Sequence, residues 1–540
     1  MAVQQLPVPS SGIPSGNTAG RPGSPSVGTT YYNGQLAQLE IWTGSAWEPC
    51  SAVPGAATIA VTDIGTSVAF GSAQGAVTIT PPTNGGLPSN YIISSSTGGF
   101  SATTSGTTVN ITVGNNGSYT FSGVAFNDYG NGVTSATSTV ALTTVPQAPT
   151  IGTASTSGAT TNVTVTWTLG NNGGKNLTSI TITPYLNGTT AQTSQTAATT
   201  TATSHTFTGL TGGSSYTFRV RATNANGVGL ESSATNSVTP PVLAVIDYLV
   251  IAGGGGGGLS GTSSSSGGGG GAGGYRTSYG TTGGGGSAEA AFFTTLSTNF
   301  TVTVGAGGNG GNSGFIPGQG ASSVLGNISS TGGGRAGSVE GNQGGTDGGS
   351  GGSGAGGGAD NFNNFTGSAG GTVGEGFNGA AGFRGQTSNN FSQIAIGGGG
   401  GGASAAGQQG GPANAPVNGN GGAGLSSNIT ASAVTRGGGG AGGGRGDTVN
   451  TAGTGGSGGG GNGGLSGSTN GNAGSANTGG GGGGSGGGSL SAAGGSGIVV
   501  LRYANTRTLT IGGGLTSTTN TSGSDKITTF TAGTGAVSIA

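Results

Sequence analysis

Runs of glycine between residues 253 and 497 constrain the fold of this chain more than any other feature. A glycine fixed in one conformation loses about 0.5–1 kcal/mol more conformational entropy than alanine. Ordering any backbone costs about 1–2 kcal/mol per residue. Because glycine has no side chain to bury, hydrophobic packing cannot offset these terms. The block must therefore either stay disordered or pack backbone against backbone with hydrogen bonds between neighbouring segments.

Composition favours the ordered alternative. The chain has 134 glycines in 540 residues, but they follow no strict G-X-Y period, which excludes collagen. Disordered chains are usually rich in charge, whereas only 5% of these residues are charged. The abundant Thr, Ser, Asn and Val favour β-structure. We therefore expect an all-β protein that also contains an ordered glycine domain.

The glycine runs suit a bundle of polyproline-II-type helices, which is the geometry of polyglycine II. Such a helix has three residues per turn and no internal hydrogen bonds, so its N–H and C=O groups point outward. Only glycine lets neighbouring helices approach closely enough to bond directly, helped by Cα–H···O contacts. Segments rich in Ser, Asn, Thr and Ala separate the runs. We expect those segments to form the turns of a compact sandwich.

Two apolar segments bracket the glycine block. Residues 243–252 (LAVIDYLVIA) precede the first run, and residues 498–503 (IVVLRY) follow the last one. A third strand-like segment, FTVTV at 300–304, lies between them. Because each bracket is a short hydrophobic run of strand length, we expect the two to pair and close a domain at 242–503.

Two segments before this block repeat one another. The sequence SYTF occurs at 118–121 and again at 215–218, and Asn and Gly follow at the same offsets. Alternation such as TFRVR at 217–221 is typical of half-buried antiparallel strands. Strand-like runs separated by turns fill each unit, so residues 55–145 and 146–241 are predicted to form β-sandwiches.

The second repeat resembles a fibronectin type III domain. The resemblance rests on Pro149, Trp167, Leu210, Tyr216 and the sequence NANG at 224–227. It implies that Trp167 fills the space between two sheets and that Tyr216 sits at a corner, with its hydroxyl bonded to backbone.

The first repeat keeps the late strands and their tyrosine, Tyr119, but has no tryptophan. Phe126 or Tyr91 could supply the missing core volume. The assignment of this repeat as an immunoglobulin- or fibronectin-like sandwich therefore depends mainly on the shared late strands.

Residues 1–54 are predicted to be an attachment module. Strand-like residues 29–33 and 37–43 meet at an Asn-Gly hairpin signal, and Trp42 and Trp47 add aromatic anchors. Such a small piece cannot bury a large core alone, so we expect it to fold when trimerised or docked. The pattern from Ala19 to Trp47 resembles a short N-terminal element of phage tail and fibre proteins.

The last residues, 504–540, are predicted to form a C-terminal β-unit. Residues 508–511 and 526–531 are strand-like, with a Ser/Thr/Gly turn region between them. The ending FTAGTGAVSIA is similar to segments of phage structural proteins.

The glycine block itself resembles the glycine-rich domain of phage tail-fibre adhesins, over about residues 245–503. The resemblance rests on YLVIAGGGGGG, AGGYR, TVTVGAGGNGG, the repeated GGGG runs and the closing GSGIVVLRY. It implies a sandwich of polyproline-II helices whose distal loops bind the host surface. The insert at 359–394 departs from the family in size, which puts a loop-by-loop correspondence in doubt.

Candidate binding residues must lie in turns, where side chains exist. The segment 360–396 is the richest in aromatics, which stack on sugar rings, or alternatively form a small core that pins the insert. Its candidates are Phe362, Phe365, Phe377, Phe383 and Phe391, with Arg384 and Glu375. A second candidate group, Tyr275, Arg276 and Tyr279, lies between two glycine runs, where structural packing is the alternative. A third is the small, polar insert 403–436.

Catalysis, metal binding and nucleic-acid binding have no support in the sequence. Net charge is −1 and no basic run exists. Cys50 and His205 are the only residues of their types, which makes a thiolate metal site or a Ser/His/Asp triad improbable. No calcium loop or paired carboxylates stand out, and the RGD tripeptide at 445–447 is attributed to chance. We expect no enzyme and no cofactor.

The function expected from these features is that of a virion appendage. No signal peptide or run of about 20 apolar residues is visible, and release of a virus particle by lysis needs neither. The first hypothesis is a homotrimeric tail-fibre or tail-tip adhesin, bound to other virion proteins through residues 1–54 and to host glycan or protein through glycine-domain loops. The alternatives are a capsid-bound fibre or decoration protein, and an extracellular-matrix or ice-binding protein.

Overall fold

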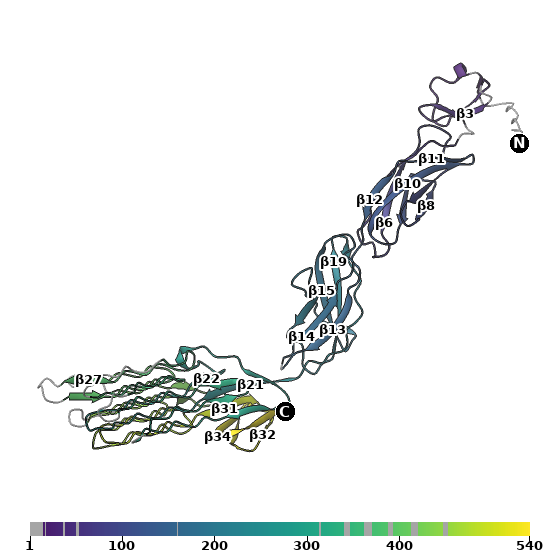
Figure 1. Ribbon diagram of the computed structural model, residues 1–540. Coiled ribbons are helices and arrows are strands. Elements are labelled where there is room, and N and C mark those ends of the chain that lie inside the picture. The colour runs from purple at the N-terminus through teal and green to yellow at the C-terminus, as the bar shows by residue number, and fades with distance from the viewer. Residues whose placement is uncertain are drawn as a thin grey trace. The chain divides into compact units, whose positions relative to one another are not determined.

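The structure is a computed structural model that describes residues 14–16, 18–35, 38–49, 53–158, 160–312, 315–339, 346–360, 370–386, 393–411, 419–445 and 452–540. The chain divides into two compact units, residues 1–240 and 241–540 (Figure 1). Over the described residues both units are all-β. The helical elements there are two 3-10 turns, η1 (Thr18–Gly20) and η2 (Gly283–Gly285). No helix in this described part is long and apolar enough to cross a membrane.

The first unit begins with a small four-stranded sheet. Its strands, in spatial order, are β1 (Ser15–Gly16), β2 (Thr30–Asn33), β3 (Gln38–Trp42) and β4 (Trp47–Pro49). The Trp47 ring lies 5.7 Å from that of Tyr31 and 5.8 Å from that of Trp42. Glu40 is only 1% exposed, and its carboxylate accepts the Arg21 Nε–H at 2.7 Å. An aromatic cluster and a paired buried carboxylate therefore hold this module together.

A β-sandwich follows, built from two antiparallel sheets. Tyr91 and Phe121 are buried in its core, whereas Phe126 is half-buried outside that core. The Tyr119 hydroxyl donates to the Asn115 carbonyl at 2.9 Å. One sheet is β5-β6-β9 and the other is β11-β10-β7-β8 with β12 also on β10. The bounds are β5 (Thr58–Asp63), β6 (Gln74–Thr80), β7 (Asn90–Ser95), β8 (Ser101–Thr104), β9 (Thr108–Thr112), β10 (Gly117–Asn127), β11 (Gly130–Thr134) and β12 (Ser138–Leu142).

The second sandwich repeats this arrangement. Trp167 is 3% exposed between its sheets, and Tyr216 is buried with its hydroxyl accepting the Thr211 N–H at 3.3 Å. One sheet is β13-β14-β18 and the other is β16-β15-β19-β20 with β17 also on β15. The bounds are β13 (Thr150–Thr156), β14 (Val163–Thr168), β15 (Leu177–Leu186), β16 (Thr190–Ala191), β17 (Gln195–Thr196), β18 (Ser204–Phe207), β19 (Tyr216–Asn224) and β20 (Gly227–Val228).

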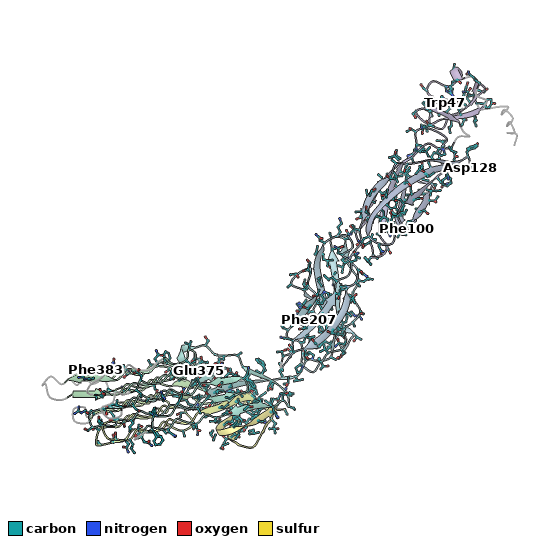
Figure 2. The ribbon with its side chains drawn as sticks, viewed as in Figure 1. Trp47, Phe100, Asp128, Phe207, Glu375 and Phe383 are labelled. Atoms are coloured by element: carbon teal, nitrogen blue, oxygen red, sulfur yellow. The ribbon has the colours of Figure 1, made fainter. Side chains whose placement is uncertain are left out.

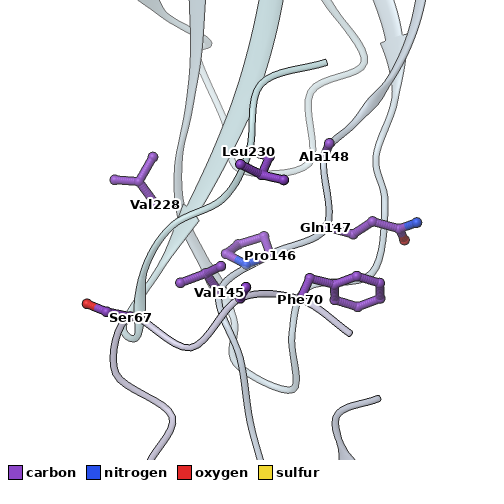
Figure 3. A pocket seen from close by; sticks show the side chains of 9 residues that line it. Ser67, Phe70, Val145, Pro146, Gln147, Ala148, Val228 and Leu230 are labelled. Carbon is purple, nitrogen blue, oxygen red and sulfur yellow. The ribbon is translucent and has the colours of Figure 1, made fainter. Parts of the chain in front are cut away.

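Buried polar groups connect the two sandwiches. The Asp63 carboxylate accepts both the backbone N–H, at 2.9 Å, and the hydroxyl of Thr143. The Asn226 side chain donates to the Thr143 hydroxyl at 2.7 Å and to the Thr144 carbonyl at 3.1 Å. The Asn226 carbonyl in turn accepts the Ser67 N–H at 2.8 Å. Beside this network, Figure 3 shows an open apolar hollow of about 570 Å³ lined by Phe70, Pro146 and Leu230 among others.

Replacing Asn226 by alanine should destabilise the first unit by about 2 kcal/mol. The substitution removes the donor to the buried Thr143 hydroxyl, whereas the Thr144 carbonyl still accepts from the Asn224 side chain. An unsatisfied buried group costs about 1–3 kcal/mol. The free energy of unfolding in urea measures the effect. Asn131→Ala, on strand β11 of the first sandwich, is the control and should unfold as the wild type does. Equal stability of the Asn226→Ala variant and the wild type would contradict the importance of this network.

A ten-stranded sheet closes one end of the second unit. Its main path is β22-β21-β31-β34-β24-β25-β26, with β23 on β21 and with β32 and β33 on β34. The two bracketing segments form β21 and β31, which pair antiparallel from Asp247↔Arg502 to Ile251↔Ile498, so the predicted pairing is confirmed. The bounds are β21 (Leu243–Ile251), β22 (Tyr275–Thr277), β23 (Phe292–Thr295), β24 (Phe300–Thr303), β25 (Ser323–Leu325), β26 (Ile328–Ser330), β31 (Ile498–Ala504), β32 (Leu509–Ile511), β33 (Leu515–Ser522) and β34 (Asp525–Ile539).

The C-terminal residues belong to this same sheet, although the sequence suggested a separate unit. Strand β34 pairs with β31 through its first half and with β24 through its second. Phe530, Val537 and Ile539 are fully buried in one core with Val250 and Leu501. The tail joins the domain because β31 offers a free hydrogen-bonding edge beside an apolar face that must be covered.

The glycine runs form a lattice of extended helices, which we refer to as the glycine lattice. In residues 253–258, successive N–H groups donate at 2.8–3.0 Å to three different segments, and every third residue returns to the same segment. The acceptor segments are 318–321, 492–495 and 268–271, and the segments that donate to its carbonyls are 333–336, 308–311 and 482–485. Residues 253–258 thus have six neighbouring segments, each of which bonds to every third residue. This is the packing expected of polyglycine-II helices.

Two hairpins complete the second unit. They are β27 (Phe383–Gln386) with β28 (Gln393–Ile396), and β29 (Leu425–Ser427) with β30 (Val434–Arg436). Figure 1 places β27 at the end of the glycine lattice that is farthest from β21, β31 and β34. We refer to that end as the distal end and to the opposite one as the sheet end.

Candidate functional site

The direction of each glycine segment determines which turns reach the distal end. Residues 253–258 leave β21 and run away from the sheet, and residues 308–311 and 482–485 run parallel to them. The turns 259–266 and 486–491 and the residues 312 and 315–317 therefore lie at the distal end, together with strands β27 and β28. Both ends of the unit lie at the sheet end, because β21 begins it and Ala540 bonds Thr508 beside β32.

Serine side chains hold the distal turns in place. The Ser260 and Ser265 hydroxyls lie 2.9 Å apart and are buried. The Ser260 N–H donates to the Ser485 hydroxyl at 2.6 Å, and the Ser266 hydroxyl donates to the Ala395 carbonyl at 2.8 Å. The first distal turn is thereby tied to the last glycine run and to β28. Because hydrogen bonds hold these turns on an ordered lattice, the turns form a preorganised surface.

Large apolar side chains are exposed on two adjacent distal turns. Phe315 is 69% exposed, Ile316 57% and Leu490 56%. The turns are neighbours, because the Ser491 hydroxyl donates to the Gly311 carbonyl at 2.7 Å. These residues were not among those predicted from the sequence. Their signal is the short apolar pair followed by Pro317 in an otherwise small and polar turn.

The predicted aromatic residues of the long insert do not form one cluster among the described residues. Phe362, Phe365 and Phe391 lie outside the part of the chain that the structure describes. Phe383 and Arg384 begin β27 at the distal end, whereas Phe377 follows Glu375 near the sheet end, as the labels of Figure 2 show. Phe377 is part of the lattice, since its N–H donates to the Gly402 carbonyl at 3.0 Å.

The second predicted group lies at the sheet end. Tyr275 is fully buried beside Ile251 in the core under the sheet. Arg276 binds Glu289 with two hydrogen bonds of 2.8 and 2.6 Å. Tyr279 lies under the guanidinium of Arg502, 5.1 Å from the ring centroid. The contacts of all three residues are those of structural side chains.

The family profile described as "Glycine-rich domain" matches residues 230–504, about half of the chain. The chain belongs to the glycine-rich domain family. A "Fibronectin type III domain" profile matches residues 147–238 of this glycine-rich domain protein, which is the second sandwich. No curated protein matches the chain.

Solved structures resemble parts of this glycine-rich domain protein. The chicken CNTN1 FN1–FN3 domains are 16% identical, with 37% of this chain and 79% of that chain covered and a TM-score of 0.22. Domains A168–A170 of titin are 21% identical, with 35% and 67% covered and a TM-score of 0.21.

The described residues offer no metal site, since none of their His, Cys, Asp and Glu side chains form a group of three or more that could hold an ion. Two ion pairs of the glycine-rich domain join Arg276 to Glu289 and Arg502 to Asp525. One such pair, Arg276 with Glu289, also includes Tyr248, whose hydroxyl donates to Glu289 at 2.8 Å. Burial raises the pKa of Glu289, but the hydrogen bonds from Arg276 and Tyr248 outweigh burial and hold it below its ordinary value.

Glu289→Gln should destabilise the glycine-rich domain by about 1–3 kcal/mol at neutral pH, since it leaves the partly buried Arg276 without a counter-charge. A carboxyl group whose pKa is lower in the folded state than in the unfolded state stabilises the fold at pH values above its unfolded-state pKa, which is about 4.3 for Glu. That contribution is lost as the pH falls through the folded pKa. Chemical unfolding between pH 7 and pH 3 should therefore show a flatter pH dependence for the variant. Parallel curves for the variant and the wild type would contradict this role of Glu289.

Proposed function

We propose that this protein is a virion appendage of a tailed bacteriophage, a tail-fibre or tail-tip adhesin. Residues 1–54 attach it to other virion proteins, the two sandwiches act as spacers, and the distal turns of the glycine lattice contact host-surface glycan or protein. The assembly acts as a homotrimer. In this role the protein performs no catalysis and uses no cofactor.

One observation carries the proposal. Strand β21, which begins the second unit, lies at the sheet end, and the distal turns lie at the opposite end of the glycine lattice. At that end lie exposed side chains, including Phe315, Ile316 and Leu490, on turns held by buried serines. Exposed apolar groups on a rigid frame are typical of recognition surfaces.

Adsorption of particles to cells tests the proposal. Purified full-length protein, added to host cells before the particles that carry it, should occupy the receptor and slow adsorption in proportion to its concentration. A capsid-bound decoration protein would leave adsorption unchanged, and that result would sink the adhesin assignment. Light scattering of the same preparation tests the trimer, which a stable monomer would contradict.

A further inference from the structure

One end of the first sandwich is built like the end of the second sandwich that the first one covers. In the second sandwich an added Cβ on Gly229 would lie 2.4 Å from the Pro146 carbonyl oxygen, and in the first sandwich the same measure between Gly132 and Pro54 is 2.2 Å. Each turn also begins with an asparagine whose side chain accepts the N–H of the second residue after it, at 2.9 and 3.0 Å. We refer to segments 53–55, 83–89 and 127–133 of the first sandwich, which contact one another, as the β10–β11 end.

The corresponding end of the second sandwich is covered by a turn of the first. The Ser67 N–H donates to the Asn226 carbonyl at 2.8 Å, and the Val145 N–H donates to the Val68 carbonyl at 2.9 Å. Val145 and Asn226 are buried there, with exposed fractions of 7% and 8%. Phe70 of the same turn lines the adjacent hollow (Figure 3). An apolar turn that offers backbone hydrogen bonds therefore fits this kind of surface.

The β10–β11 end is exposed at the same positions. Val53 corresponds to Val145, since each valine lies 3.4 Å from the Cβ that would be added to the glycine of its turn. Val53 is 41% exposed, and Tyr129, which corresponds to Asn226, is 58% exposed. Among the described residues nothing donates to the Tyr129 carbonyl. These values hold with the small four-stranded sheet in place, so that sheet leaves the surface open.

A hollow and one charge define what the β10–β11 end can bind. The hollow has a volume of about 340 Å³ and is lined by Ile41, Leu87 and Asp128 among others. Asp128 is exposed and is the only charged residue in the three segments. It lies at the opposite end of the first sandwich from Phe100 (Figure 2). An apolar surface with a single carboxylate at its rim is complementary to an apolar turn that has a basic side chain beside it.

We propose that the β10–β11 end docks an apolar turn of a β-domain in another virion protein, with a basic side chain of that protein beside Asp128. This inference rests on the proposed function, and it extends the attachment surface from residues 1–54 onto the first sandwich. A second copy of this chain cannot supply the equivalent turn, because residues 67–70 contact the second sandwich of their own chain. Tyr129 suits the centre of such an interface, since a tyrosine ring offers a large contact area and its hydroxyl a hydrogen bond.

Photocrosslinking in purified particles identifies what occupies this surface. With Tyr129 replaced by p-benzoylphenylalanine, the chain should crosslink to a different virion protein, at a peptide that contains apolar residues and a Lys or Arg, as mass spectrometry of the product shows. The same probe at Thr189, an exposed turn residue of the second sandwich, is the control and should not give that product. A crosslink between two copies, a crosslink within one copy, no crosslink, or an equal yield from Thr189 would each overturn the proposal.

Variants separate this docking from the adhesin function. Tyr129→Asp and Asp128→Lys should each lower incorporation of the protein into particles roughly tenfold, as expected for a central interface contact. Their unfolding in urea should be unchanged, because both side chains are exposed. Val228→Ser removes a half-exposed valine from strand β20 of the second sandwich and should be incorporated normally.

The purified Tyr129→Asp variant should still compete with particles for adsorption as the wild type does. Normal incorporation of Tyr129→Asp or Asp128→Lys would overturn the docking proposal and leave the adhesin function standing. Failure of the wild-type protein to compete would overturn the adhesin function, whatever the incorporation of the variants.

Discussion

Gly255→Ala should destabilise the second unit by more than about 4 kcal/mol, enough to leave it unfolded at moderate temperature. Gly255 lies at the centre of the glycine lattice, where its N–H donates to Gly271 and its carbonyl accepts from Gly482. An added Cβ would lie 1.9 Å from the Gly334 carbonyl oxygen and 2.5 Å from its carbon. These atoms are backbone, so no side-chain rotation can relieve the overlap. The helices would have to separate, which breaks hydrogen bonds on several sides at once.

Gly513→Ala is the matched control for this prediction. Gly513 is in the same unit, has no left-handed φ, and an added Cβ would meet nothing within 4 Å. Alanine there should change stability by less than about 1 kcal/mol. Circular dichroism and urea unfolding of the two variants measure the difference. If the Gly255→Ala and Gly513→Ala variants gave comparable unfolding curves, the lattice would be loosely packed. The close approach of neighbouring backbones at Gly255 would then not explain its stability.

The double substitution Phe315→Ser with Ile316→Ser should reduce adsorption to host cells at least tenfold while leaving unfolding unchanged. Both side chains are more than half exposed, so their removal costs little folding energy. Truncation of a central apolar contact in an interface commonly weakens binding by about 2 kcal/mol or more. Particles carrying the variant, or the purified variant used as a competitor, provide the measurement.

Val373→Ser controls for the loss of an exposed apolar group in general. Val373 is 95% exposed, and it precedes Glu375, whose carboxylate accepts the Thr331 N–H at 2.7 Å beside β26. It therefore lies at the sheet end. Its substitution should leave adsorption at the wild-type level. If both variants adsorb normally, the distal turns are not the contact surface, and if both are impaired, the effect is not specific to those turns.

The sequence alone predicted much of this fold. Local sequence patterns predicted three features. They are the pairing of the apolar segments 243–252 and 498–503, the second sandwich, and the lattice of extended glycine helices. Period-2 alternation identifies a half-buried strand wherever it occurs, as at 217–221. The entropy of glycine leaves an ordered block only one way to form, by bonding between backbones.

The candidate site was predicted less well, and the reason is visible in particular residues. Tyr275 and Arg276 look like members of an exposed loop between two glycine runs, yet they form β22 and pack against the closing sheet. Phe315 and Ile316 were overlooked, although they are exposed at the distal end. Whether a turn reaches the distal end depends on the direction of the preceding segment, and adjacent glycine runs of similar composition run in opposite directions.

The amino-acid sequence by itself determined the strands of the second sandwich, the two apolar strands that flank the glycine block, and that this block orders through its own main chain. Tertiary structure alone decided which helices are neighbours, which turns lie together, and that β34 completes the closing sheet. The physical reason is that hydrogen bonds between glycine backbones are alike at every position. Because no side chain distinguishes one glycine helix from another, these bonds do not specify which helices become neighbours or in which register. Only the packing of the whole unit determines both.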